Sequence, residues 1–122
     1  MSDELLARAD QVAVRAYAPY SNYHVGAAAL ARDGRVYEGV NVENAAYPLG
    51  ICAERAAIAS AVVAGCRPGE LVEIAITAPP CGGCRQWLYE FHLQRVTFRK
   101  SDGSVASFTP VELLPEAWDL PA

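Results

Sequence analysis

Three cysteines and one glutamate have the residue types and the spacing of a metal-dependent active site. Cys81 and Cys84 stand in the run PPCGGC with two residues between them, the spacing of a metal knuckle. Cys52 precedes Glu54 by two residues in the run GICAERAA. Four protein ligands close a structural zinc site, whereas three leave one coordination position open for chemistry. The pattern therefore predicts a catalytic zinc held by the three cysteines.

The CxxC pair by itself is compatible with other roles: a redox pair, part of a four-ligand structural zinc site, or two small core residues. A structural site needs a fourth protein ligand, and the remaining candidates fit poorly. Cys66 follows the far end of the helix expected after Cys52, about 20 Å away at a rise of about 1.5 Å per residue. His24 and His92 lie outside any ligand-like spacing. We therefore favour the three-cysteine site and interpret Cys66 as a free thiol.

Glu54 is expected on the same helical turn as the first cysteine, beside the open coordination position. A carboxylate there can take a proton from the activated water and return it to a ring nitrogen and a leaving amine. Without the cysteines, a first-turn glutamate that improves the helix dipole would be the better interpretation. Arg55 and Arg85 each follow a motif residue and could donate hydrogen bonds to the sulfurs. For Arg55, in an otherwise apolar helix, we prefer that role to a solvated surface position.

The elements that must position these residues can be predicted from periodicity and turn signals. They are a helix within residues 5–16, two strands within 25–42 joined at Asp33-Gly34, a helix over 52–64, a strand over 71–77, a helix over 85–91, a strand over 95–99 and a short helix over 109–115. This order favours one α/β sheet covered by helices, in a single domain over residues 1–122. Both cysteine motifs fall at junctions that lead into a helix, where ligands gather in such sheets.

Composition excludes several classes of function. The 122 residues are 52% hydrophobic, enough for one domain with a real core, and the net charge of −4 argues against binding to nucleic acid. No apolar run reaches the roughly 18 residues of a membrane helix, and the acidic N-terminus is unlike a secretory signal. We therefore expect a soluble cytoplasmic protein with reduced cysteines and no membrane partner.

The combination CAE followed by PCGGC is the three-cysteine form of the signature of zinc-dependent nucleobase deaminases. Over nearly its whole length the chain resembles the small homotetrameric cytidine deaminases. The segments that carry the resemblance are AYAPYSNYHVGAA, DGRVYEGVNVENAAYPLGICAERAAI, PCGGCRQ and VELLP. The resemblance implies a three-layer α/β/α sandwich with a five-stranded mixed sheet, one zinc per chain, and a homotetramer whose active sites lie at subunit boundaries.

The resemblance also implies roles for residues at matching positions. Asn41 and Glu43, in the run NVEN, correspond to residues that hydrogen-bond the ribose 3′-hydroxyl. Their spacing agrees, since side chains two apart at a strand end share one face. The backbone of Ala53 corresponds to the group that helps hold the pyrimidine edge. Tyr23 stands where the family usually has a phenylalanine near the base. Trp118 would be an aromatic lid on a neighbour's substrate, or else a local hydrophobic anchor.

The function implied is hydrolytic deamination of cytidine and 2′-deoxycytidine to the uridine forms and ammonia, in pyrimidine salvage. One alternative is deamination of a modified cytosine nucleoside of the blasticidin type, which the run NVENAAYPLG disfavours. A non-catalytic zinc-binding module is a second, disfavoured by the intact Glu54. Editing of nucleic acid is disfavoured because the chain is acidic and has no basic, aromatic groove. The short APP segment before PCGGC and Tyr23 depart from the family pattern and leave the substrate preference open.

Overall fold

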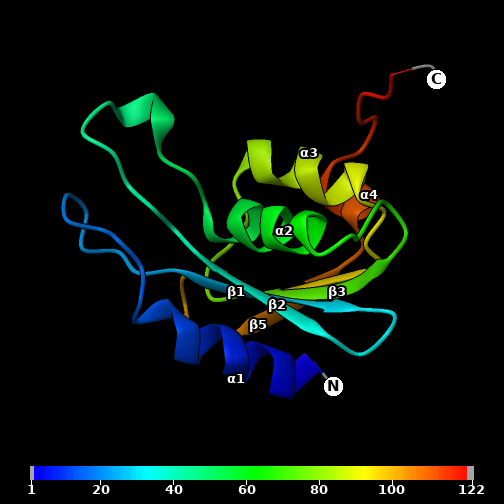
Figure 1. Cartoon of the computed structure of the whole chain (residues 1–122), viewed down its shortest axis with the longest axis horizontal. Helices are drawn as coiled ribbons and strands as arrows, with labels where there is room; N and C mark the ends of the chain where they lie inside the picture. The colour runs from blue at the N-terminus through cyan, green and yellow to red at the C-terminus, as the bar shows by residue number, and fades with distance from the viewer. Residues whose placement is uncertain (1, 121–122) are drawn as a thin grey trace.

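A five-stranded mixed sheet forms the centre of the protein, which we describe over residues 2–120 from a computed structural model (Figure 1). The strands are β1 (Gly26–Ala31), β2 (Val36–Val40), β3 (Leu71–Ile76), β4 (Arg95–Arg99) and β5 (Val105–Phe108). They lie in the order β2-β1-β3-β4-β5. Only β3 and β4 are parallel neighbours, and the other three pairs are antiparallel.

Helices cover both faces of this sheet. One face carries α1 (Ser2–Ala13), and the other carries α2 (Ala53–Val63), α3 (Gly82–Glu90) and the short α4 (Pro110–Leu113), as Figure 1 shows. A single 3-10 turn, Tyr47–Leu49, lies in the loop before α2. This confirms the three-layer α/β/α arrangement expected from the resemblance. None of the helices in residues 2–120 is long and apolar enough to cross a membrane.

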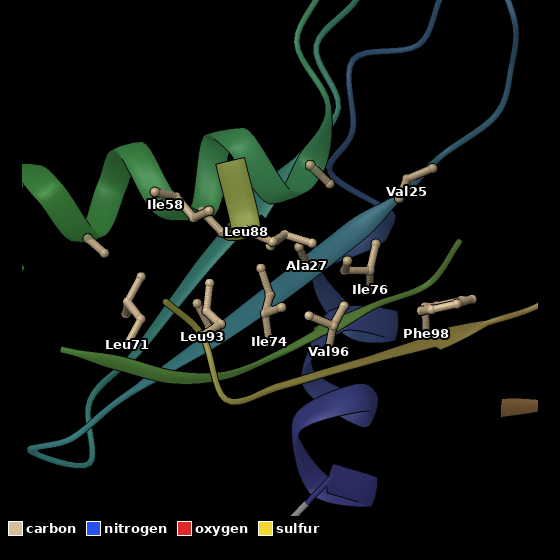
Figure 2. Packing of buried hydrophobic residues seen from close by; sticks show 14 of the residues in the cluster. Val25, Ala27, Ile58, Leu71, Ile74, Ile76, Leu88, Leu93, Val96 and Phe98 are labelled. Atoms are coloured by element: carbon tan, nitrogen blue, oxygen red, sulfur yellow. The ribbon is translucent and has the colours of Figure 1, made fainter. Parts of the chain in front are cut away.

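The two faces of the sheet bury different amounts of apolar side chain. Ile74 and Ile76 of β3 point toward α2 and α3, where Ile58 and Leu88 meet them in the larger core cluster (Figure 2). Ala75 lies between these isoleucines in sequence and faces α1 in the smaller cluster, as strand alternation requires. The larger core therefore lies under the two helices that carry the cysteines.

Close backbone contact fixes α2 on the sheet. Gly39 of β2 has no room for a side chain, because a Cβ there would collide with the backbone of Ala53 and Ala57. The absence of a side chain therefore lets the first turns of α2 pack directly against β2. As a result, the start of α2, where Cys52 and Glu54 lie, is held at a set height above the sheet.

Besides α3, which begins at Gly82 and not at residue 85, two local features differ from the sequence-based expectation. The first helix ends at Ala13, before Ala16, because Tyr17 is needed in an extended bridge to Val42. The Tyr17 N–H donates to the carbonyl of Asn41 at 3.1 Å, and its carbonyl accepts from the N–H of Glu43 at 2.8 Å. The second difference is β5, which periodicity did not reveal because an edge strand of four residues is too short to show a pattern.

Candidate active site

The starts of two helices bring three sulfur atoms together. Cys52 is the N-cap residue of α2, Cys81 is the N-cap residue of α3, and Cys84 lies in the first turn of α3. The Sγ atoms of Cys52 and Cys81 are 3.9 Å apart, and those of Cys81 and Cys84 are 3.2 Å apart. The predicted ligand set therefore meets at one point, although the three residues come from two separate helices.

This cluster fits zinc. Zn–S bonds of about 2.3 Å in a tetrahedron place sulfur atoms about 3.8 Å apart. The three Sγ atoms all lie within 4.8 Å of one another. Among the His, Cys, Asp and Glu side chains of residues 2–120, these three cysteines form the group that could hold a metal ion. Cys66 is buried in the larger hydrophobic core instead. Three thiolates and an open fourth position are the ligand set of a catalytic rather than a structural zinc.

The sulfur atoms share charge and hydrogen bonds. The hydrogen bond from Cys84 lowers the pKa of the Cys52 thiol to about 6. The same pairing, together with burial, raises the pKa of Cys84. Arg55 approaches from α2, where its Nε donates to Sγ of Cys84 at 3.3 Å and its Nη2 to Sγ of Cys81 at 3.7 Å. A guanidinium in this position offsets the negative charge that three thiolates concentrate on the site.

Arg85, for which the sequence also allowed a role at the sulfurs, has other partners. Its Nε donates to the carbonyl of Pro80 and its Nη1 to the carbonyl of Leu113, both at 3.0 Å. Arg85 follows Cys84 on α3 and therefore leaves the helix in a different direction, toward the last residue of α4. It ties the C-terminal segment to the turn before Cys81 and does not bind the sulfurs.

Glu54 is the buried acid of this region. It is only 3% exposed and lies in the first turn of α2, two residues after Cys52. Burial raises the pKa of its carboxyl to about 7, and the nearby charge of Cys52 acts in the same direction. An acid that titrates near neutral pH can both accept and return a proton during a reaction. Ala53, beside it, is completely buried.

Asn41 and Glu43 lie next to the metal ligands through a backbone bridge. Val42, between them, pairs with Ile51 in an antiparallel bridge, and Ile51 is followed by Cys52. In an antiparallel pairing, two residues that lie directly opposite one another have their side chains on the same face. Next to this bridge, Asn41 lies opposite Cys52. The bridge therefore brings the amide and the carboxylate to the side of the chain from which the Cys52 sulfur projects.

The same two side chains also hold the loop that carries Tyr23. Asn41 accepts from the N–H of Val25 through Oδ1 and donates to the carbonyl of Tyr23 through Nδ2, each at 2.8 Å. Glu43 accepts from the N–H of Tyr20 at 2.9 Å and of Ser21 at 3.1 Å, and also from the Ser21 hydroxyl. Sequence reasoning did not single out Ser21. Its only signal was its position inside a segment that resembles the family.

The two aromatic candidates lie apart. The Tyr23 side chain is 59% exposed on its loop. Trp118 is 66% exposed, and its carbonyl accepts from Nε2 of Gln86 on α3 at 3.0 Å. Together with Trp87 and Phe91, Trp118 lines a cavity of about 370 Å³. Within its own chain, Trp118 therefore packs beside α3. Its role as a lid on another subunit stays a prediction.

Comparisons with known proteins agree with this site. Residues 1–100 match the model of the cytidine and deoxycytidylate deaminase zinc-binding region. The cytidine deaminase of Halalkalibacterium halodurans is 42% identical over 122 residues, which cover 93% of this chain and 91% of that protein. The crystal structure of cytidine deaminase from Burkholderia pseudomallei matches with a TM-score of 0.90 at 42% identity, over 97% of this chain and 99% of that one.

A second crystal structure, of cytidine deaminase from Mycobacterium tuberculosis, matches with a TM-score of 0.83 at 37% identity, over 97% of both chains. The similarity therefore extends over nearly the whole chain. The matched family region is a zinc-binding one, and the Cys52, Cys81 and Cys84 cluster fits such a site. The chain belongs to the cytidine deaminase family.

Proposed function

We propose that this protein is a zinc-dependent hydrolase that converts cytidine and 2′-deoxycytidine to uridine and 2′-deoxyuridine with release of ammonia. The observation that carries the proposal is the buried acid Glu54 two residues from Cys52, in a cluster of three cysteines that leaves one metal position open. The curated relatives that the chain matches at 42% and 38% identity are cytidine deaminases. The chemistry that zinc supplies when bound is Lewis-acid activation of water.

Glu54 moves the protons of the reaction. Water adds to C4 of the cytosine ring, and the carboxylate takes one proton of that water and passes it to ring N3. The remaining hydroxyl proton then passes through the same carboxyl to the exocyclic amine, the C4–N bond breaks, and ammonia leaves. A raised pKa supports this shuttle, because a carboxyl near neutrality gives up and regains a proton at little cost.

Arg55 and the residues proposed to contact the substrate complete the proposed site. The two hydrogen bonds from Arg55 withdraw negative charge from the thiolates, so that the metal they hold remains a useful Lewis acid. Asn41 and Glu43 bind the ribose 3′-hydroxyl, the backbone of Ala53 holds the pyrimidine edge, and Tyr23 packs near the base. The antiparallel bridge between Val42 and Ile51 supports this assignment, because it links the sugar side to the metal side.

We further propose that the protein is a homotetramer with shared active sites. Cys81 is exposed in the single chain. Large apolar side chains are exposed on two loops beside the site, the loop over residues 17–23 and the loop over residues 47–51. They are Tyr17, Tyr20, Tyr23, Tyr47, Leu49 and Ile51. Exposed apolar groups gathered in this way are typical of a surface that another protein covers. A second copy of the chain would bury them, and a neighbour's Trp118 would close the pocket.

The proposal is tested by adding purified, zinc-loaded protein to cytidine and following the change in absorbance together with the ammonia released. Uridine identifies the product, and a chelator-treated sample serves as the control. A parallel reaction with 2′-deoxycytidine and with a blasticidin-type nucleoside separates the main proposal from its alternative. Zinc-loaded protein that forms neither uridine nor deoxyuridine would contradict the proposed function.

A further inference from the structure

The hydroxyl of Ser21 connects Glu43 to the loop that carries Tyr23. Ser21 Oγ donates to Oε2 of Glu43 and accepts from the N–H of Tyr23 at 3.0 Å. Asn22, between the two loop residues, has φ = 60° and turns the backbone so that both contacts form. A serine hydroxyl has one donor proton and two acceptor lone pairs, so it can make both of these hydrogen bonds at the same time.

Glu43 uses its two carboxylate oxygens differently. Oε1 accepts from two backbone N–H groups, those of Tyr20 and Ser21. Oε2 accepts from the Ser21 hydroxyl. A carboxylate offers about four acceptor sites, so these three hydrogen bonds leave one, and it lies on Oε2. The Ser21 hydroxyl also lowers the pKa of the Glu43 carboxyl, which keeps it ionised as an acceptor.

We propose that Ser21 is a positioning residue for the sugar of the substrate: it fixes Oε2 of Glu43 and so favours nucleosides that present a hydroxyl to this oxygen. The inference rests on the proposed function, in which Glu43 binds the 3′-hydroxyl. A glutamate side chain loses rotamer entropy when a ligand orders it, and a carboxylate ordered in advance avoids this cost.

The place of Glu43 in the fold explains why a fixed side-chain conformation of this residue would affect substrate binding. The Val42–Ile51 bridge holds Glu43 at a set place relative to Cys52, with N···O distances of 3.0 and 2.9 Å. The backbone is therefore fixed, and the remaining freedom lies in the side-chain torsions, which Ser21 restricts. Loss of the hydroxyl would leave the metal site intact and weaken the contact to the sugar.

The chain offers a matched control. Ser104 also donates its hydroxyl to a carboxylate, Oδ1 of Asp102 at 2.6 Å, in the turn between β4 and β5. Ser104→Ala therefore removes the same kind of hydrogen bond from an exposed turn outside the proposed site. Ser21→Ala, Ser104→Ala and wild type are compared on cytidine and on 2′,3′-dideoxycytidine, which lacks the 2′- and 3′-hydroxyls and keeps the 5′-hydroxyl.

Ser21→Ala is expected to raise KM for cytidine roughly five- to tenfold, the loss of about one hydrogen bond. Its KM for dideoxycytidine and its zinc content should equal those of wild type, as should both KM values of Ser104→Ala. In a Glu43→Gln background, Ser21→Ala should add no further loss, because the two residues act through one contact.

Other outcomes overturn the inference. An equal rise in KM for both nucleosides would mean that Ser21 only maintains the loop, and an unchanged KM for cytidine would mean that it has no such role. Fully additive effects of Ser21→Ala and Glu43→Gln would also contradict it. Wild-type protein that converts neither nucleoside would overturn the proposed function itself, and this inference with it.

Discussion

Val42 and Ile51 exchange both backbone hydrogen bonds in an isolated antiparallel bridge, with N···O distances of 3.0 and 2.9 Å. This one pairing joins two parts of the site that lie in different segments of the chain. Asn41 and Glu43 flank one side of the bridge, and Cys52 follows the other. The backbone positions of the residues proposed to hold the sugar and the metal are therefore fixed relative to one another by this bridge.

Replacing a single ligand should remove the metal. Cys81→Ala is expected to lose most of the bound zinc, because two thiolates no longer define a tetrahedral site, whereas wild type should hold about one zinc per chain. Metal analysis of the purified proteins measures this. Cys66→Ala is the control: its thiol lies in the core, so zinc should remain while stability falls by about 1 kcal/mol. Equal zinc in the Cys81→Ala and wild-type proteins would contradict the ligand set.

Replacement of Arg55 and replacement of Arg85 should have different effects on zinc affinity. Arg55→Met removes the hydrogen bonds to Cys84 and Cys81, and zinc affinity measured by chelator competition is expected to fall about 10- to 100-fold. Arg85→Met should leave zinc affinity near the wild-type value and lower thermal stability instead, since Arg85 binds two backbone carbonyls. If Arg85→Met reduced zinc affinity as much as Arg55→Met, the charge-offsetting role of Arg55 would be wrong.

Trp118 and the tail around it test the shared pocket. Light scattering or analytical ultracentrifugation should give a tetramer for the full chain. Trp118→Ala is expected to raise KM for cytidine roughly tenfold, the cost of losing an aromatic anchor, with little change in unfolding temperature. Removal of residues 116–122 should act in the same way. An active monomer, or a truncated protein with unchanged KM, would rule the shared pocket out.

Local motifs were enough to predict the metal site. Each of the two motifs, Cys52 to Glu54 and Cys81 to Cys84, lies within a few adjacent residues and names its metal ligands directly. The structure brings the three sulfurs together. The helices and the four longer strands were also predictable, because their apolar periodicity spans enough residues. The mixed five-stranded sheet came from the resemblance, since β5 is too short for a periodic signal.

Contacts between distant segments were not predictable from the sequence. Arg55 and Arg85 each follow a motif residue, and the apolar helix around Arg55 favours only that one. The packing of α2 against α3 decides which arginine reaches the sulfurs. Ser21 meets its carboxylate partner across 22 residues of chain, with no local pattern to link them. Such pairings depend on where two loops cross, which the hydrophobic pattern of either loop does not specify.

The most direct test of the central claim is the rate of uridine formation by zinc-loaded Glu54→Gln compared with zinc-loaded wild type. The substitution keeps the size of the side chain and removes its ability to carry a proton. Wild type should convert cytidine to uridine and ammonia, and Glu54→Gln should retain zinc and nucleoside binding while its turnover falls by about 10²- to 10⁴-fold. A variant that holds zinc and turns cytidine over at close to the wild-type rate would contradict the account.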